Sequence, residues 1–404
     1  MNSKIISRPK ILCFVSHYLP GYLSGGPVKS ISNLADHLRD HFEFFIITSD
    51  RDLGGKKYSF VKINSWNKVS NSNVYYASKS KLTLNSIAKL IRSTKHDILY
   101  LNSFFNFTFT TLPLIARRFM SVSSSPCVLA PRGEFSPAAL NIKYWKKKFF
   151  IFLTNLFQLY SGLNWQAANK QELNNIFKIF KIYKKLVNFA PDLPVKINKL
   201  KKNYLSNNKK IKKKPGILNI IFLSRITPIK NLDFILKFIN KINKTIRLSI
   251  YGPIEDKIYW KKCKRIIKIM PSNITVKYKG IAFPENIFSI FSAHDIFILP
   301  SGGESYGHVV IESLISGTPV IISDKTPWKN DGNKAITVLP LNKEIAWINE
   351  IEKWADHNQN TILKRSFAAK KFAKLYLLNK KNIIQNKNFF LSLLINSHKN
   401  IDLL

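Results

Sequence analysis

Short apolar runs typical of strands alternate with helical stretches twice along the 404-residue chain, and this alternation restricts the fold more than any other feature. It predicts an α/β protein with two parallel, doubly wound sheets, because each parallel connection needs a crossover that is usually a helix. The predicted strands are 11–16, 44–48, 74–77, 98–102, 128–130 and 163–167 in the first series, and 217–223, 248–251, 276–278, 296–299, 320–323 and 336–339 in the second.

A segment rich in Pro, Asn and Lys separates the two series. We therefore expect two Rossmann-like domains, at 1–190 and 216–375, joined by a linker at 191–215 and followed by a helical tail at 376–404. The length agrees, since a single hydrophobic core rarely exceeds about 250–300 residues. Ligand sites of open parallel sheets lie beyond the carboxyl ends of strands, so we expect the site in a cleft between the domains.

The most informative motif is the segment 300–312, Pro-Ser-Gly-Gly-Glu-Ser-Tyr-Gly-His-Val-Val-Ile-Glu, between a predicted strand and a helix. Its glycines allow a ligand to approach the backbone, and the N–H groups at a helix start bind phosphate. Glu304 and Glu312 would be separated by about 12 Å along the axis if most of the interval were helical. One carboxylate could then serve a transferred sugar and the other a ribose, whereas the alternative is a surface helix with two ordinary glutamates.

A second strand-to-helix turn carries Arg225 and Lys230. Preorganised cations stabilise the charge that develops on a leaving nucleoside diphosphate, and arginine can bind phosphate oxygens in bidentate fashion. In so lysine-rich a chain, a solvated surface position is the alternative for Lys230.

Together these segments resemble the retaining glycosyltransferases of family 4, the "glycosyl transferases group 1" set with the GT-B fold. The last two of the following motifs are the most specific. The resemblance rests on Gly25-Gly-Pro-Val, Ala130-Pro-Arg-Gly-Glu-Phe-Ser-Pro137, Ser-Arg-x4-Lys230, Ile250-Tyr-Gly-Pro, Tyr278-Lys-Gly280, Glu304-x7-Glu312 and Thr318-Pro-Val-Ile-Ile-Ser323.

The resemblance implies catalytic roles for Glu304 near the donor sugar and for Arg225 and Lys230 on the donor diphosphate, with Glu312 on the ribose. The nucleotide sugar would be a co-substrate, so neither a cofactor nor a metal is expected. Further substrate contacts are implied for Gly25 and Gly26 in the first domain, and for Gly252, Gly280, Ile281, Ser305, Tyr306, Gly307 and His308 in the second.

The acceptor side departs from the family pattern. Many members have a histidine after the strand that here ends at Ala130, whereas this chain continues Pro131-Arg-Gly-Glu134. A retaining transfer in which the leaving phosphate takes the acceptor proton needs no general base and fits this difference. Arg132 and Glu134 are candidate acceptor contacts, with a purely structural capped turn as the alternative.

Other patterns favour ordinary structure. Asp50-Arg-Asp52 matches the Asp-x-Asp form of metal-dependent transferases, but such short matches arise by chance, and we interpret it as a loop. The three cysteines, Cys13, Cys127 and Cys263, have no metal-ligand spacing, and a reducing cytoplasm suits them. No apolar run approaches the ~20 residues that span a bilayer.

The formal net charge of +41 would attract polyanions, although an AT-rich genome alone would produce much of this lysine excess. The basic and aromatic segment 143–157 suits the interface of an anionic membrane, whereas the alternative is a buried helix with lysines extended toward solvent.

These features predict transfer of a sugar from a nucleotide-diphosphate donor, UDP favoured over GDP, to a glycan or lipid-linked acceptor. The setting would be assembly of cell-surface polysaccharide, lipopolysaccharide or glycolipid, in the cytoplasm or peripherally on the inner face of the cytoplasmic membrane. A nucleotide-sugar epimerase of the same fold is the enzymatic alternative. The other is a basic nucleic-acid-binding protein, against which the dispersed charge and the absence of a recognised nucleic-acid module argue.

Overall fold

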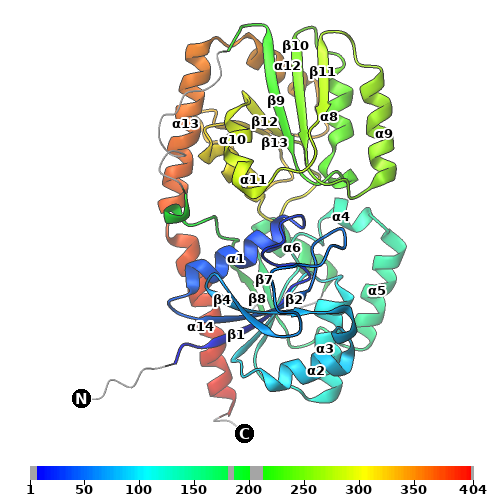
Figure 1. Cartoon of the computed structure of the whole chain (residues 1–404), viewed down its shortest axis with the longest axis vertical. Helices are drawn as coiled ribbons and strands as arrows, with labels where there is room; N and C mark the ends of the chain where they lie inside the picture. Colours follow the sequence, from blue (N-terminus) through cyan, green and yellow to red (C-terminus); the bar gives the residue numbers. More distant parts are fainter. Residues whose placement is uncertain (1–6, 181–185, 201–212, 402–404) are drawn as a thin grey trace, which may run out of the picture. The chain divides into compact units, whose positions relative to one another are not determined.

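The computed structural model describes residues 7–180, 186–200 and 213–401, which form two compact units (Figure 1). The first unit comprises Met1–Lys196 together with Lys380–Leu404, and the second comprises Ile197–Asn379. The chain therefore leaves the first unit, forms the second, and returns. Much of the predicted linker, 201–212, lies outside the described residues.

The first unit contains an eight-stranded sheet in the order β3-β4-β2-β1-β5-β6-β7-β8. Its strands are parallel except β3, which pairs antiparallel with β4. The central strand β1 buries Leu12 and Phe14 on one face and Ile11 and Cys13 on the other, so both faces need a helical cover. The strands are β1 Lys10–Phe14, β2 Glu43–Ser49, β3 Trp66–Val69, β4 Ser72–Ala77, β5 Ile98–Asn102, β6 Cys127–Ala130, β7 Asn164–Ala167 and β8 Val187–Phe189.

Helices cover both faces of this sheet. α2, α3, α5 and α6 pack on one face, and α1 packs on the other together with α14, which contributes Phe389, Phe390 and Leu393. The returning C-terminal segment thus completes the core of the first unit. The helices are α1 Gly26–Leu38, α2 Leu84–Ser93, α3 Leu112–Met120, α4 Pro137–Asn141, α5 Tyr144–Leu156, α6 Lys170–Ile179 and α14 Lys381–Ile401, with short turns η1 Lys79–Lys81 and η2 Phe107–Thr111.

The second unit contains a fully parallel sheet in the order β11-β10-β9-β12-β13-β14. The chain order reverses direction between β9 and β12, which makes this position the topological switch point. The strands are β9 Ile217–Leu223, β10 Thr245–Tyr251, β11 Ile274–Tyr278, β12 Ile296–Leu299, β13 Val320–Ser323 and β14 Ile336–Leu339. The helices are α8 Leu232–Ile239, α9 Lys257–Lys268, α10 Ile287–Ser292, α11 His308–Ile315, α12 Glu344–Asp356 and α13 Gln359–Leu378, with turns η4 Ile197–Lys199, η5 Pro228–Lys230 and η6 Pro284–Asn286.

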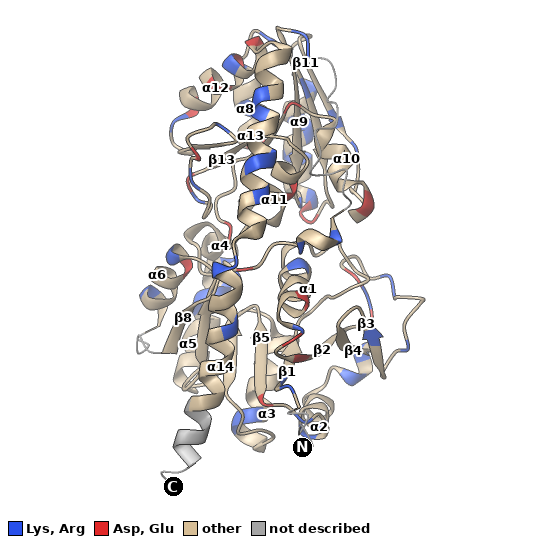
Figure 2. Ribbon diagram, turned by 90° about the vertical axis from the view of Figure 1, so that its left-hand side faces the viewer, with Lys and Arg blue, Asp and Glu red and all other residues tan. Residues whose placement is uncertain are grey.

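The α/β class and both parallel sheets are confirmed, and each predicted strand is present with its ends shifted by a few residues. The sequence missed β3 and β8. It also treated the tail as a separate segment, whereas 380–404 belongs to the first unit. Lys and Arg occur on helices of both units, among them α8, α13 and α14 (Figure 2). Among the helices described, none is long and apolar enough to cross a bilayer.

Candidate active site

The loops that follow β9 and β12 are joined at the switch point of the second sheet. Gly302 N donates to Ile229 O at 2.7 Å, and Asn231 Nδ2 donates to Pro300 O at 2.9 Å. Because adjacent parallel strands end at the same edge, residues far apart in sequence meet here. The two motifs singled out in the sequence therefore form one local structure.

Lys230 and Glu304 are in direct contact in this structure. Lys230 Nζ donates to Glu304 Oε1, and the two side chains are only 11% and 12% exposed. Removing a charge from water is costly, so a nearly buried ion pair contributes little to stability by itself. Its position at a switch point instead favours a role in binding a charged ligand.

Arg225 lies in the same β9 loop but is far more accessible. Its Nη1 is 2.6 Å from Oε2 of Glu255, and both side chains are more than one third exposed, at 37% and 38%. Exposed ion pairs of this kind are weak, so the guanidinium can exchange its partner for a phosphate. The sequence analysis did not identify Glu255.

The carboxyl ends of β9, β10 and β11 also meet through glycine backbone. Gly252 N donates to Gly280 O at 2.8 Å, and a Cβ on Gly252 would lie 1.8 Å from Ser224 O, beside Arg225. Only glycine fits this close approach. A Cβ on Gly280 would meet open space, and Ile281 beside it is 38% exposed, so this end of the sheet is accessible to a ligand.

α11 begins directly after the Glu304 loop. Gly307, at φ 82°, precedes the helix and His308 begins it. The first N–H groups of a helix lack intrahelical partners and favour anions, so the start of α11 agrees with the expected phosphate-binding role, which stays a prediction. Tyr306 and His308 are buried with ring centroids 4.7 Å apart, so their side chains are not available to a ligand and the expected contacts of this segment would come from its backbone.

The expected spacing of Glu304 and Glu312 needs correction. Glu304 lies in the loop and Glu312 lies on α11, so only the second half of the interval is helical. The separation of about 12 Å assumed a mostly helical interval and does not apply. The loop instead turns Glu304 back toward Lys230.

A supporting loop after β13 was missed in the sequence. Glu304 N donates to Lys325 O at 3.3 Å, and Trp328 Nε1 donates to Tyr306 O at 2.6 Å. Ser323 Oγ donates to Ser301 O. These bonds attach the Glu304 loop to the end of β13 and the loop that follows it. The signal was available, because polar residues directly after a parallel strand belong to the same sheet edge.

In the first unit, the start of α1 is open. Gly25 has φ 67° and precedes the helix, and a Cβ on Gly25 or Gly26 would meet nothing within 4 Å. These glycines follow β1 and so lie at the carboxyl end of the first sheet. The accessible backbone agrees with a ligand-facing role, which stays a prediction.

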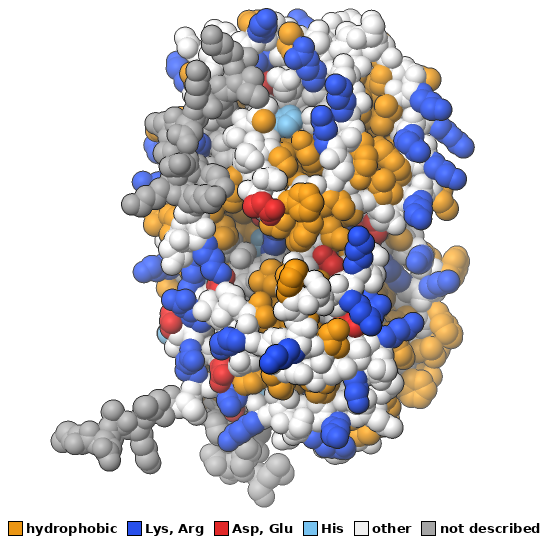
Figure 3. All heavy atoms as spheres, viewed as in Figure 1, with side chains coloured by type: hydrophobic (Ala, Val, Ile, Leu, Met, Phe, Trp, Pro, Cys, Tyr) orange, Lys and Arg blue, Asp and Glu red, His pale blue; other side chains and the backbone are white. Residues whose placement is uncertain are grey.

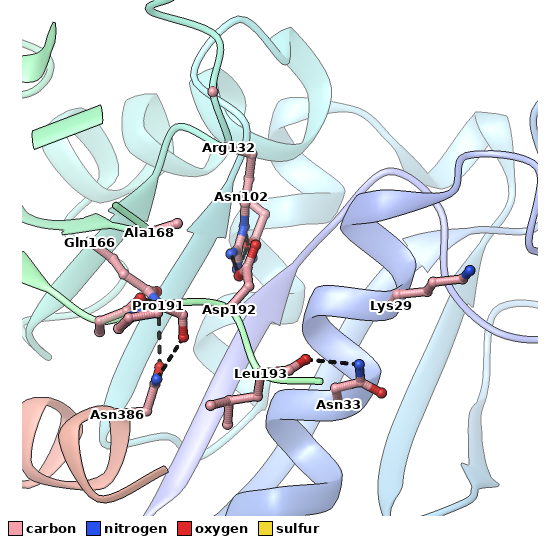
Figure 4. Close-up of polar contacts among 12 residues, drawn as sticks. Lys29, Asn33, Asn102, Arg132, Gln166, Ala168, Pro191, Asp192, Leu193 and Asn386 are labelled. Atoms are coloured by element: carbon pink, nitrogen blue, oxygen red, sulfur yellow. Dashed lines mark hydrogen bonds and ion pairs between the residues drawn. The ribbon is translucent and has the colours of Figure 1, made fainter. Parts of the chain in front are cut away.

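Arg132, in contrast, points into the interior of the first unit (Figure 4). Its side chain is 7% exposed and pairs with Asp192, which is 3% exposed. Arg132 Nη2 also donates to Asn102 Oδ1 at 2.8 Å and to Tyr100 Oη at 2.6 Å. Burial opposes the charge and Asp192 favours it, and the balance raises the pKa of Arg132. This arrangement favours the structural interpretation over an acceptor contact.

The Arg132 network continues to the returning C-terminal helix. Tyr100 Oη donates to Gln166 Oε1, and Asn386 of α14 donates to Pro191 O at 2.8 Å beside it. Figure 4 shows Gln166, Pro191 and Asn386 together at one end of this group. A buried network with every member bonded fixes local geometry strongly. It therefore attaches both 190–193 and α14 to the ends of the first sheet.

Glu134 is also bonded internally. It accepts hydrogen bonds from Ser103 Oγ, from Phe104 N and from Phe105 N at 3.0 Å. Burial raises the pKa of Glu134, opposed by these donors. Its carboxylate orders the loop after β5, and the capped-turn alternative is again favoured.

The Asp50-Arg-Asp52 triplet is likewise part of the loop structure. Asp50 pairs with Arg51 at 2.7 Å, and Asp52 accepts backbone N–H groups from Tyr22, Leu23 and Leu53. Within residues 7–180, 186–200 and 213–401, no group of three or more His, Cys, Asp or Glu side chains is placed to hold a metal. The three cysteines are buried and unbridged.

Residues 218–357 match the family model described as Glycosyl transferases group 1. The chain is 24% identical over 311 residues to an uncharacterised 41.2 kDa protein in the cps region of Klebsiella pneumoniae, covering 72% of this chain and 79% of that one. It is 29% identical over 168 residues to an uncharacterised glycosyltransferase of Sulfolobus islandicus rod-shaped virus 1, covering 40% and 45%.

Two solved structures cover nearly the whole chain. Anabaena HepE in complex with UDP-glucose has a TM-score of 0.65 at 14% identity, covering 95% of this chain and 99% of that one. Sucrose-phosphate synthase of Thermosynechococcus elongatus has a TM-score of 0.65 at 12% identity, covering 96% and 100%. The chain has the GT-B fold. Together with the match of the second unit to the group 1 model, this supports a glycosyltransferase.

Proposed function

We propose that this glycosyltransferase moves a sugar from a nucleotide-diphosphate donor, UDP-linked in preference to GDP-linked, to a glycan or lipid-linked acceptor. The observation that carries the proposal is the Lys230–Glu304 pair at the switch point of the second sheet, with Arg225 and the start of α11 on the same edge. Two cations and a helix N-terminus suit a diphosphate. The UDP-glucose bound to the structurally similar HepE supports a uridine nucleotide.

The roles follow from charge. A diphosphate entering this edge offers Lys230 and Arg225 a doubly charged partner in place of Glu304 and Glu255. Glu304 is then released toward the donor sugar, and the two cations stabilise the charge that grows on the diphosphate as the glycosidic bond breaks. Glu312, one turn into α11, serves the ribose.

We further propose that transfer retains the anomeric configuration and uses no metal. The cations at the switch point supply positive charge that a metal would otherwise provide. In such a transfer, the leaving phosphate oxygen takes the proton of the acceptor hydroxyl, so no separate base is needed. The internal bonding of Glu134 supports this, because its carboxylate is not free to act as one.

Thermal unfolding with UDP-, GDP-, ADP- and dTDP-glucose tests the donor. A ligand at about 100 times its Kd adds about 2.7 kcal/mol to the folded state, so the melting temperature of the second unit should rise with the UDP sugar. No rise with any nucleotide sugar would refute the donor site. Release of UDP only when an acceptor is added would exclude an epimerase, and the anomeric signal of the product would report retention.

A further inference from the structure

The helix α5 of the first unit carries apolar side chains on its exposed side as well as on its buried side. Phe150 and Ile151 pack against the core, and Thr154 is buried. On the opposite side, four large apolar side chains are exposed at spacings of four, three and four residues. They are Trp145 (76%), Phe149 (62%), Phe152 (60%) and Leu156 (63%), which we call the α5 stripe.

Residues at these spacings share one face of a helix, so the α5 stripe is continuous. Figure 3 shows hydrophobic side chains gathered, with basic ones beside them, on the flank where Figure 1 draws α5. Isolated apolar residues are normal on a protein surface, but a contiguous patch rimmed by charge marks an interaction site. The stripe cannot be core, because the core face of α5 lies opposite.

Along the chain, every charged residue near the stripe is positive. Lys143, Lys146 and Lys148 are exposed beside it, and no Asp or Glu occurs between Glu134 and Glu172. Lys148 Nζ lies 5.5 Å from the ring centroid of Trp145, which joins the basic and aromatic groups into one surface. A partner must therefore be apolar and anionic together.

Lys147 does not belong to this surface. Its Nζ donates to Ala139 O at 2.6 Å and lies 4.9 Å from the ring centroid of Phe105. Burial lowers the pKa of Lys147, opposed by Glu134. Lys147 belongs to the same basic segment of the sequence, 143–157, but the structure assigns it to the interior side of the helix.

We propose that α5 lies in the interface of an anionic lipid bilayer, with the α5 stripe among the acyl chains and Lys143, Lys146 and Lys148 at the headgroups. An amphipathic helix with Trp, Phe and Leu on one face and flanking lysines has the composition for this position. Thirteen residues are too few to span a bilayer, so the attachment is peripheral and reversible. The proposal does not depend on the donor chemistry.

Co-sedimentation with vesicles tests the attachment. The full chain should pellet with vesicles of equal parts phosphatidylglycerol and phosphatidylcholine, and much less with phosphatidylcholine alone. Raising the salt from 0.1 M to 1 M shortens the Debye length from about 10 Å to about 3 Å, so most of the difference between the two vesicles should disappear. Equal pelleting with both vesicles at low salt, or none with either, would overturn the proposal.

A charge variant combines Lys143→Glu, Lys146→Glu and Lys148→Glu. Each lysine near an anionic surface contributes about fivefold to binding, so the partition coefficient should fall on the order of 100-fold or more. The control combines Lys261→Glu, Lys264→Glu and Lys268→Glu on α9, which changes the net charge equally at exposed positions. If the control lost as much binding, the total charge and not α5 would be responsible.

An apolar variant combines Trp145→Ser, Phe149→Ser and Phe152→Ser, and its control combines Phe60→Ser, Phe119→Ser and Ile258→Ser at other exposed sites. Only the α5 variant should lose vesicle binding, while its melting temperature stays near that of the wild type. Size-exclusion chromatography identifies the competing occupant. A wild-type dimer that this variant converts to monomer, with unchanged vesicle binding, would assign the stripe to a second copy of the chain.

Discussion

Two ion pairs, one in each unit, share a position at strand ends and differ in their surroundings. Lys230–Glu304 joins loops after β9 and β12, and Arg132–Asp192 joins loops after β6 and β8. Arg132 also donates to Asn102 and Tyr100, so protein groups occupy most of its guanidinium. Within the described part of the chain, Lys230 forms an ion pair with Glu304 alone, and we propose that a diphosphate replaces this carboxylate. Charged residues therefore cluster at strand ends in both units. The number of protein partners that each cation has indicates whether it is available to a ligand.

The largest expected effect is on the stability of the first unit. Arg132→Ala leaves Asp192 buried without its cation, and breaking a buried pair in this way costs about 3–5 kcal/mol of unfolding free energy. Urea denaturation followed by circular dichroism measures it. Arg39→Ala is the control, because its pair with Asp40 is exposed and should contribute less than about 1 kcal/mol. An Arg132→Ala protein as stable as the wild type would remove the distinction between the two pairs.

The second-largest expected effect is on turnover, through residues of the second unit. Lys230→Ala and Arg225→Ala should each lower kcat by about 100-fold or more, the loss expected when one group stabilising transition-state charge is removed. Lys241→Ala is a matched control, because Lys241 forms an exposed pair with Glu344 at 2.6 Å. Near wild-type turnover in both folded variants would refute the diphosphate assignment.

The variants Glu304→Gln and Glu312→Gln should distinguish a carboxylate that acts on the reacting sugar from one that binds the donor. Glu304 is placed for the reacting sugar, so its loss should lower kcat by roughly 10-fold or more, whereas loss of Glu312 should raise the KM for the donor. Steady-state kinetics on the donor distinguishes these outcomes. The opposite pattern would mean that the two carboxylates exchange roles, and would weaken the argument drawn from the Lys230 contact.

The longer parallel strands could be predicted because buried strands are continuous apolar runs, whose signal is local. β3 and β8 could not. β3 is an edge strand, Trp66–Val69, with polar residues between its apolar ends, and β8 has three residues before a proline. The docking of α14 depends on contacts such as Asn386 with Pro191, which no local pattern records.

The meeting of the Lys230 and Glu304 motifs at one sheet edge was predictable for a similar reason, since each motif directly follows a strand. The orientation of Arg132 and Glu134 was not. Their sequence, Arg-Gly-Glu after a strand, left acceptor contacts and a structural capped turn as alternatives. The partners that turn these side chains inward are Asp192 and the backbone at 104–105. Burial of a charge depends on such distant partners.

The smallest expected effect tests whether a partly buried polar group of the first unit, His96, is structural as well. His96 Nδ1 lies 2.6 Å from Thr94 O and Nε2 lies 2.9 Å from Ser123 Oγ. Burial lowers the pKa of His96 below its usual 6.5, opposed by the hydrogen bond to Thr94 and the charge of Asp97 and reinforced by Arg117. Below that pH the unfolded chain takes up a proton that the folded chain does not, so stability present above pH 6.5 is lost as the pH falls.

The variant His96→Gln should therefore lose less unfolding free energy than the wild type on acidification from neutral pH, as measured by urea denaturation at several pH values. His41→Gln, at an exposed position, should follow the wild type. If the unfolding free energy of His96→Gln fell on acidification as steeply as that of the wild type, the partial burial of His96 would not contribute to the pH dependence. The structural role seen in the Arg132 network would then not extend to this histidine.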